Sequence, residues 1–274
     1  MLSLPFVGEV ASPSGEDEGV PHEEFFMHMY PFYREEDLFP REFTQAIERP
    51  WGILYHNPDN PDSYDSNHAL IFRNQVDDLP AVLAEIADFY LSRGGQPIIY
   101  QSILDDGWFG KIAPVLAEAG YHSWQEAQHW MLLVQDSTIC ARDDVRQVTA
   151  WTDDLITHLY EAAGEPWEIA VAKRQLANPN TIYFAVYEDD KPVGAIYGHV
   201  NDDGICRIDY LLVATAYRGK GLGRALTHAF VCHCRQNSIP CALWPDGDTP
   251  RRIYEEAGFR FVCTKMAGRA SWHP

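Results

Sequence analysis

The sequence of 274 residues predicts an α/β fold in which strands and helices follow one another in two successive halves. Three observations support this class. Hydrophobic residues make up 46% of the chain, which is typical of a folded globular protein. Strand-like and helix-like patterns alternate over residues 145–268. A shorter pattern of the same kind occupies residues 78–134.

The composition limits the classes of function. The six cysteines are few and scattered, which predicts a cytoplasmic protein without a disulfide framework. The first residues, MLSLPFVGEV, fit neither a signal peptide nor a membrane span, so we expect no membrane contact. Residues 1–140 contain 6 Lys and Arg against 23 Asp and Glu, a net charge of −17, and residues 141–274 contain 15 against 17, a net charge of −2. Neither half has the basic excess that a nucleic-acid partner requires.

Three regions are predicted along the chain. Residues 1–21 are rich in Ser, Pro, Gly and acidic residues, which indicates a flexible tail. The segment DSTICARDD at 136–144 separates two periodic regions. It predicts a domain boundary near residue 141, with domains at 22–140 and 141–274.

The C-terminal half contains a predicted β-hairpin, because strands at 181–188 and 192–200 flank the turn EDDK. A strand at 204–214 then leads into a glycine-rich segment and a helix to about residue 236, which has apolar residues at helical spacing. The last helix is predicted to begin with Thr249 as N-cap and Pro250 at its first position, and to stop at Gly258. The remaining predicted elements are a strand at 145–150, helices at 152–163 and 166–176, a strand at 239–244 and the final strand FRFVCTKM.

The N-terminal half repeats the end of this pattern. A helix at 78–92 precedes the strand QPIIY, the apolar helix KIAPVLAEAGY and a strand that ends in WMLLV. The N-terminal segment RGGQPIIY…LAEAGY is similar to the segment RQNSIPCALW…YEEAGF nearer the C-terminus. This comparison predicts a diverged tandem duplication. The N-terminal copy has QVDDLP where the C-terminal copy has its glycines.

The segment YRGKGLGRAL at 217–226 places three glycines among three cations, namely Gly219, Gly221, Gly223, Arg218, Lys220 and Arg224. An ordinary turn between a strand and a helix rarely needs three glycines. The start of the following helix offers free backbone N–H groups and the positive end of the helix dipole. Glycines allow a ligand to approach this backbone closely, so the segment predicts a phosphate-binding site.

Two common phosphate-binding motifs do not fit this segment. A Walker A loop requires G-x-x-x-x-G-K-[ST], and this spacing is missing. A Rossmann fingerprint requires G-x-G-x-x-G/A, and both registers fail because their sixth residues are Arg224 and Leu226. Asp246 could imitate the ribose-binding acid and keeps a dinucleotide site open as an alternative. A Rossmann loop, however, follows the first strand of its domain, and several strands precede this one.

The segment LLVATAYRGKGLGRAL resembles the acyl-CoA motif of the GNAT superfamily of N-acyltransferases, whose pattern [QR]-x-x-G-x-[GA] is met by Arg218, Gly221 and Gly223. RRIYEEAGFRFV resembles the second motif of that superfamily, a helix with a tyrosine followed by a Gly-Phe turn into a strand. The resemblance covers roughly residues 145–268. It implies a mixed, mostly antiparallel sheet with flanking helices, preceded by a degenerate GNAT-like domain.

The resemblance also implies which residues would bind acetyl-CoA. The N–H groups of residues 219–224 would hold the pyrophosphate, and the backbone of residues 211–213 would pair with the pantetheine between two splayed strands, 204–214 and 239–244. The implied cofactor-binding set is Leu211, Leu212, Val213, Arg218, Gly219, Lys220, Gly221, Leu222, Gly223 and Arg224. The family often has Asn at the position of Gly247, so that one contact is in doubt.

Transfer of an acyl group to an amine requires a polarised carbonyl, a neutral amine and a proton for the leaving thiolate. Backbone N–H near Leu212 can polarise the carbonyl. The resemblance implies Tyr254 as the proton donor; the alternative is a core aromatic residue. Strand alternation places Arg207, Asp209, Leu211 and Val213 on one face towards the expected cleft. Asp209 could then relay the proton of the amine or bind its charge, or simply pair with Arg207.

The sequence CHC at 232–234 raises the question of a metal site. Adjacent helical residues differ by about 100°, so Cys232 and Cys234 point to nearly opposite sides and cannot readily share an ion. We therefore expect no metal. Trp151, Tyr160 and Trp167 are expected in the core rather than as stacking platforms.

Two functions of different classes remain. The first is an acetyl-CoA-dependent N-acetyltransferase acting on a primary amine of a small molecule or a protein. The acidic N-terminal half would attract a cationic acceptor; the alternative is that its acids only keep the surface soluble. The second is a non-catalytic acyl-CoA sensor that kept the glycine segment. Either would be a monomer or a homodimer, and the retention of Tyr254 favours the enzyme.

Overall fold

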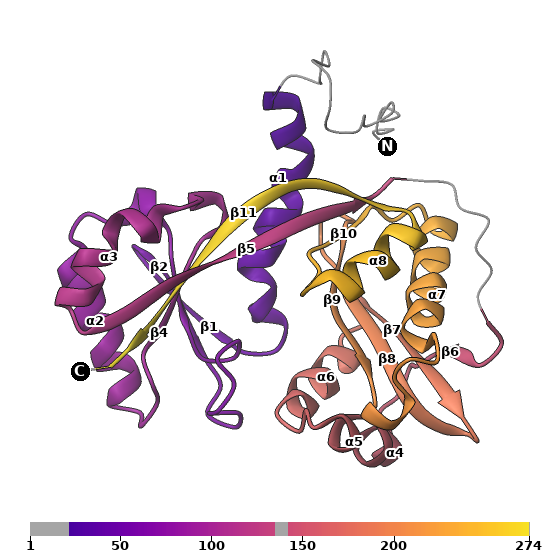
Figure 1. The fold of residues 1–274 in the computed structure, drawn as a ribbon. Coiled ribbons are helices and arrows are strands. Elements are labelled where there is room, and N and C mark those ends of the chain that lie inside the picture. Colours follow the sequence, from indigo (N-terminus) through magenta and orange to yellow (C-terminus); the bar gives the residue numbers. More distant parts are fainter. Residues whose placement is uncertain (1–21, 135–141, 274) are drawn as a thin grey trace.

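The computed structural model describes residues 22–134 and 142–273. The predicted tail at 1–21 and most of the predicted boundary segment lie outside the described residues. Within them, eleven strands form one sheet in the order β1-β2-β3-β4-β11-β5-β10-β9-β8-β7-β6 (Figure 1). Most neighbouring strands are antiparallel, and helices flank the sheet, as predicted.

The elements of the N-terminal half are α1 (His22–Leu38), η1 (Phe39–Glu42), β1 (Gln45–Arg49), β2 (Gly52–His56), β3 (Ala69–Ile71), η2 (Arg73–Gln75), α2 (Leu79–Leu91), β4 (Ile98–Gln101), η3 (Ile103–Asp105), α3 (Trp108–Glu118) and β5 (Tyr121–Leu133). Those of the C-terminal half are β6 (Val145–Gln147), α4 (Asp153–Leu155), the π-helical η4 (Ile156–Tyr160), α5 (Glu161–Ala163), α6 (Glu168–Ala177), β7 (Thr181–Glu188), β8 (Lys191–Val200), β9 (Cys206–Val213), η5 (Thr215–Tyr217), α7 (Leu222–Gln236), β10 (Cys241–Leu243), α8 (Asp248–Ala257) and β11 (Phe259–Trp272).

The two long strands β5 and β11 join the halves. They pair antiparallel along their whole length, from Phe259 opposite Leu133 to Trp272 opposite Tyr121. β11, from the C-terminal end of the chain, also pairs with β4, and β5, from the N-terminal half, also pairs with β10. Figure 1 shows this pair running between α2 and α3 at one end and α7 and α8 at the other. Each long strand therefore belongs to both flanks of the sheet.

The two flanks of the sheet have the same arrangement around this central pair. On each side a parallel pair comes first, β4 with β3 and β10 with β9. Antiparallel neighbours follow outwards, β2 and β1 on one side and β8 and β7 on the other. Each flank has its own buried apolar cluster against α2 and α3 or against α7 and α8.

Helix α1 packs where the flanks meet. Its buried side chains Met29, Phe32 and Tyr33 form one apolar cluster with Trp130 of β5 and Ala267 of β11. The ring of Tyr33 meets that of Trp130 edge to face, with 5.1 Å between the centroids. A helix from the N-terminal half thus anchors the middle of the sheet.

The hairpin prediction is confirmed. β7 and β8 pair antiparallel, and the turn residues Asp189 and Asp190 have φ values of 49° and 59°. Two positive φ values are typical of the type I′ turns that match the twist of a two-residue hairpin.

Two predicted helices differ from the observed ones. The helix expected at 152–163 is a short α-helical turn, a π-helical segment and another short turn. Thr249 is not an N-cap, because α8 already begins at Asp248. Gly247 precedes it with φ of 89° and ψ of 176° and takes the capping position. The stop at Gly258, with φ of 105°, is as predicted.

The close packing of β11 against β4 and α3 leads to a stability prediction. A β-carbon at Gly268 would lie 2.5 Å from Gln101 Oε1 and 2.7 Å from Phe109 Cβ. Gly268→Ala should therefore destabilise the protein by about 1–3 kcal/mol through overpacking. Gly95→Ala is the matched control, since its nearest contact would be 3.6 Å. Equal unfolding midpoints of the two variants in urea would contradict the observed insertion of β11.

Candidate active site

The glycine turn lies between β9 and α7. Gly219 and Gly221 have φ values of 80° and 78°, and Gly221 is the N-cap of α7. A β-carbon added to either would meet nothing within 4 Å, so it is the left-handed backbone that favours glycine there. The space beside the turn is open, and the first N–H groups of a 15-residue helix face it. The turn can therefore bind an anion such as a phosphate.

The three cations of the turn have different surroundings. Arg218 is exposed and donates from Nε to the carbonyl of Val213 over 3.0 Å. Lys220 places its Nζ 4.6 Å from the ring centroid of Tyr217. Arg224 forms an ion pair with Glu256 of α8 at 2.6 Å, so its charge is already compensated. In the described part of the chain, Arg218 and Lys220 have no carboxylate partner, and they remain the two cations for a phosphate.

The predicted splay of two strands is confirmed. β9 and β10 pair only where Cys206 and Arg207 meet Cys241 and Ala242. Beyond Arg207, the backbone of β9 pairs with β8 alone, up to Val213 opposite Gly194. One edge of β9 is therefore available for an extended ligand.

A β-bulge at Asp209 changes the face that each side chain of β9 occupies. Tyr197 of β8 lies opposite Tyr210, and the next residue, Gly198, lies opposite Ile208, so Asp209 is the extra residue. Bulges reverse the alternation of the bulged strand. Leu211 therefore packs with Ile208 in the cluster under α7. The prediction that Arg207, Asp209, Leu211 and Val213 share one face was wrong.

A cavity of about 750 Å³ lies between the two halves. Its walls come from α1, the loop before β3, β4, β5 and β11 on one side, and from α6, β9 and α8 on the other. It brings together the predicted residues Asp209, Leu211, Leu212, Arg218 and Tyr254. Its walls carry the carboxylates of Glu36, Asp37, Asp65, Glu165, Glu168, Asp209 and Asp246 against the guanidinium groups of Arg207, Arg218 and Arg269. The cavity is therefore suited to cations.

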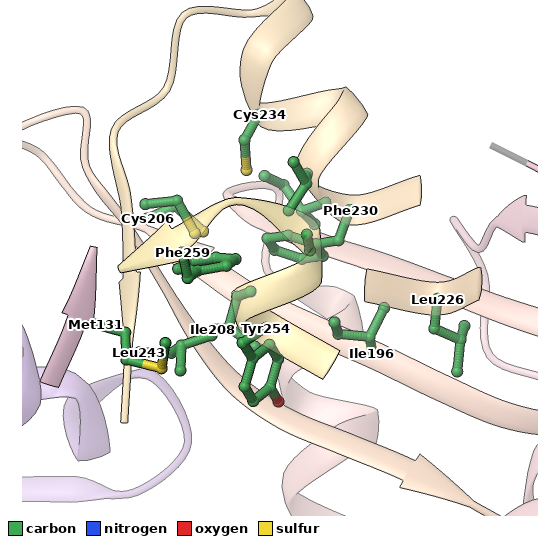
Figure 2. Close-up of a cluster of buried hydrophobic side chains, with 14 of the residues drawn as sticks. Met131, Ile196, Cys206, Ile208, Leu226, Phe230, Cys234, Leu243, Tyr254 and Phe259 are labelled. Atoms are coloured by element: carbon green, nitrogen blue, oxygen red, sulfur yellow. The ribbon is translucent and has the colours of Figure 1, made fainter. Parts of the chain in front are cut away.

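Tyr254 lies at the bottom of the apolar cluster under α7 and α8 (Figure 2). Its ring is 5.8 Å from that of Phe259, and its hydroxyl points away from the labelled cysteines. The side chain also lines the cavity. Burial raises the pKa of the Tyr254 phenol, which therefore stays protonated at neutral pH.

Asp209 belongs to a network that crosses the two halves. Arg207 donates from Nη1 to Asp209 Oδ1 over 2.6 Å and from Nε to Glu36 of α1. Glu36 also accepts a hydrogen bond of 3.1 Å from Trp244 Nε1. Burial raises the pKa of Asp209, and the guanidinium of Arg207 opposes this shift. The pairing of Asp209 with Arg207 is thus observed, and Asp209 still borders the cavity.

Two further residues of the cavity wall, Glu168 and Trp167, were not predicted as site residues. Glu168, at the start of α6, is 3% exposed and accepts a hydrogen bond from the hydroxyl of Tyr197. Burial raises the pKa of Glu168 well above its ordinary value. Trp167 was expected in the core, but it is 39% exposed, and its ring lies 6.3 Å from that of Tyr210. Local periodicity could not reveal either residue, because the cavity forms only when α6 meets β9.

Three cysteines meet elsewhere in the C-terminal half. The sulfur atoms of Cys206, Cys234 and Cys241 lie within 4.8 Å of one another, and all three side chains are buried. Cys232 does not belong to this group, as the opposite directions of Cys232 and Cys234 predicted. The cluster packs among apolar side chains such as Phe230 and Phe259 (Figure 2). The absence of a metal remains a prediction.

Comparison with known proteins identifies the family of this region. Residues 149–259 match the sequence model of the acetyltransferase (GNAT) family. No curated protein matches the chain. Among the described residues, no helix is long and apolar enough to cross a membrane.

Solved structures share the fold over most of the chain. A GCN5-related N-acetyltransferase from Kribbella flavida has a TM-score of 0.60 at 14% identity, covering 88% of this chain and 94% of its own. A conserved protein of unknown function from Staphylococcus epidermidis has a TM-score of 0.56 at 18% identity, with 84% and 95% covered. A GCN5-related N-acetyltransferase-like protein from Streptococcus suis has a TM-score of 0.53 at 12% identity, with 92% and 99% covered. At these identities the likeness concerns the fold, and together with the family match it shows that the chain carries a GNAT acetyltransferase domain at residues 149–259.

Proposed function

We propose that the protein is an N-acetyltransferase that moves an acetyl group from acetyl-CoA to a primary amine. One observation carries this proposal. A single cavity combines a free strand edge, a buried phenol and several carboxylates, and Arg218 of the adjoining glycine turn also lines it. These are the groups needed to hold a phosphate-bearing thioester, protonate a leaving thiolate and attract an ammonium ion.

Acetyl-CoA would bind along β9 and the glycine turn. The free N–H groups of residues 219–224 would receive the pyrophosphate, with Arg218 and Lys220 adding positive charge. The backbone of Leu211, Leu212 and Val213 would pair with the pantetheine at the splayed edge. Leu222, Gly223 and Arg224 form the first turn of α7, and Arg224 would act through the Glu256 ion pair rather than as a free charge.

The chemistry divides between β9 and α8. Backbone N–H near Leu212 would polarise the thioester carbonyl. Tyr254 would protonate the departing sulfur, and its raised pKa keeps the required proton in place. Asp209, held by Arg207, would bind the positive charge of the amine.

The N-terminal half would serve the acceptor and would bind no acyl-CoA of its own. The segment QVDDLP lies between β3 and α2, where the C-terminal half has its glycine turn between β9 and α7. Asp78 caps α2 there, accepting a hydrogen bond of 3.2 Å from the N–H of Ala81. A carboxylate thus occupies the place where a phosphate would bind. This supports a tandem duplication with a degenerate first copy and one acyl-CoA per chain.

The glycine turn can be tested by calorimetry with CoA. Leucine at both Gly221 and Gly223 should abolish CoA binding, because bulky side chains would fill the space beside the N-terminus of α7. The matched control for Gly221 is Gly204→Leu, which has a comparable φ of 73° and equally open surroundings but lies in the turn between β8 and β9. Unchanged affinity in the double variant, or two CoA molecules bound per wild-type chain, would contradict the assignment.

The role of Tyr254 can be tested by removing only its hydroxyl. Tyr254→Phe keeps the contact with Phe259, so affinity for CoA should hold while kcat falls about 10²-fold, the loss of a general acid. Release of free thiol from acetyl-CoA measures this rate. Tyr187→Phe, outside the cavity, is the control. A wild-type rate in Tyr254→Phe, when chemistry limits turnover, would assign the side chain to packing alone.

The acidic cavity predicts a preference for cationic acceptors. Butylamine, 1,4-diaminobutane and 4-aminobutyrate share a chain length and differ in the charge at the far end. Their kcat/KM values should rank diamine first and amino acid last, because seven carboxylates line the cavity. Salt at ~1 M, where the Debye length is about 3 Å, should reduce the difference. Equal kcat/KM values for all three would contradict a role of the carboxylates in acceptor choice. Tight CoA binding without turnover on any amine would instead indicate an acyl-CoA sensor.

A further inference from the structure

Glu168 differs from three other carboxylates of the cavity wall. Glu36 and Asp209 share the guanidinium of Arg207. Asp37 accepts hydrogen bonds from Ser102 Oγ at 2.5 Å and from the N–H of Ile103 at 2.9 Å. Glu168 accepts one hydrogen bond, from Tyr197 to Oε1, and no Lys, Arg or His within residues 22–134 and 142–273 pairs with it. Its second oxygen is left for the cavity.

A buried carboxylate without a cation is costly, and the surroundings of Glu168 increase the cost. Asp209 on β9, Asp65 in the loop before β3 and Glu165 in its own segment all disfavour its charged form. The Tyr197 hydrogen bond opposes them, and burial dominates. Tyr160, Tyr183 and Tyr210 complete the ionisable surroundings and bring no positive charge. A ligand that supplies a cation would remove this cost.

The position of Glu168 suits the reacting nitrogen. Tyr197, which holds it, lies opposite Tyr210 and therefore next to the bulge at Asp209. Tyr197 and Leu212 belong to the same apolar cluster, so they occupy one face of the sheet. The proposed thioester site, at the backbone edge of β9 near Leu212, thus borders the face that Glu168 covers.

A second polar group in the cavity wall, the side-chain oxygen of Gln128, also lacks a hydrogen-bond donor. Gln128 of β5 is 4% exposed, and its Oε1 has no hydrogen-bond partner among the described residues. This acceptor lines the same cavity as Glu168. An unsatisfied buried acceptor costs about 1–3 kcal/mol, which a ligand N–H would recover. Both observations indicate a ligand rich in N–H donors.

We propose that Glu168 binds the ammonium group of the acceptor and takes its proton before attack on the thioester. The class of acceptor is a primary alkylammonium without a neighbouring carboxylate. The inference rests on the proposed acetyl transfer. It makes Glu168 the catalytic base and leaves Asp209, which is held by Arg207, as a supporting charge.

Glu168 receives one proton from R–NH3⁺ and later releases it to water. The neutral nitrogen forms the C–N bond with the acetyl carbon while the C–S bond breaks. The sulfur takes the Tyr254 proton, and the second proton lost by the nitrogen returns to the phenolate through solvent. One amide, one free thiol and one released proton result.

Glu168→Gln is the principal test, because the amide can still accept from Tyr197 and only the basic oxygen is lost. With butylamine and acetyl-CoA, kcat/KM for the amine should fall by 10² or more, while the KM for acetyl-CoA stays within twofold. The wild-type profile of kcat/KM should decline at low pH as Glu168 becomes protonated, and this decline should disappear in the variant. Glu161→Gln is the control, since Glu161 is exposed and lies outside the cavity.

Tyr197→Phe tests the same residue without changing its charge. Loss of the hydrogen bond removes an interaction that lowers the pKa of Glu168. The low-pH decline of kcat/KM should therefore move to higher pH. A purely structural role of Glu168 would lower activity equally at every pH and would leave the decline in place.

Two results separate failure of this inference from failure of the proposed function. Suppose that the wild type transfers acetyl groups. If the pH profile of kcat/KM is then unchanged in Glu168→Gln and its low-pH decline is lost in Asp209→Asn, the role of Glu168 is overturned and the acetyltransferase proposal stands. If the wild type transfers nothing, the acetyltransferase proposal fails. Calorimetry with butylamine then tests whether Glu168 binds the amine. Loss of butylamine binding in Glu168→Gln would support this role, and unchanged binding would overturn it.

Discussion

The pairing of β5 with β11 is the constraint on which the rest of the structure depends. Each strand completes the half of the molecule to which the other belongs in sequence. The cavity lies where these strands, α1 and the splayed edge of β9 meet, so its shape depends on their register. A shift by one residue would turn every side chain of β11 to the opposite face. The geometry of the site is therefore a property of the whole chain.

The connection between the halves is also electrostatic. Arg207 lies in the C-terminal half but pairs with Glu36 of α1, and His199 pairs with Glu35 of the same helix at 2.8 Å. Glu35, His199 and Arg207 are buried, where removal of one partner leaves an uncompensated charge. Removal of α1 would thus expose a buried arginine and disturb Asp209, although the helix lies outside the GNAT domain at residues 149–259.

Local signals in the sequence were sufficient for the features that short segments determine. The glycine turn, the Asp189–Asp190 hairpin and the stop of α8 at Gly258 each depend on backbone conformations that a few residues specify. The mixed α/β class and the GNAT resemblance follow from such segments in order. The bulge at Asp209 could not be predicted, because it depends on the register between β8 and β9, which the sequence of one strand does not specify. The burial of Glu168 depends on the contact of α6 with β8, which periodicity does not encode.

The place of β11 in the sheet also affects how the protein can be made. Until β11 is synthesised, β4 and β5 each lack a neighbour on one side, and before β10 is synthesised β5 lacks neighbours on both sides. Multidomain chains usually fold their N-terminal unit during synthesis, but here that unit cannot complete its sheet before β11 is made. Unpaired strand edges invite pairing with other chains. In the nascent protein the edges of β4 and β5 are therefore open to such pairing until β11 takes its place between them.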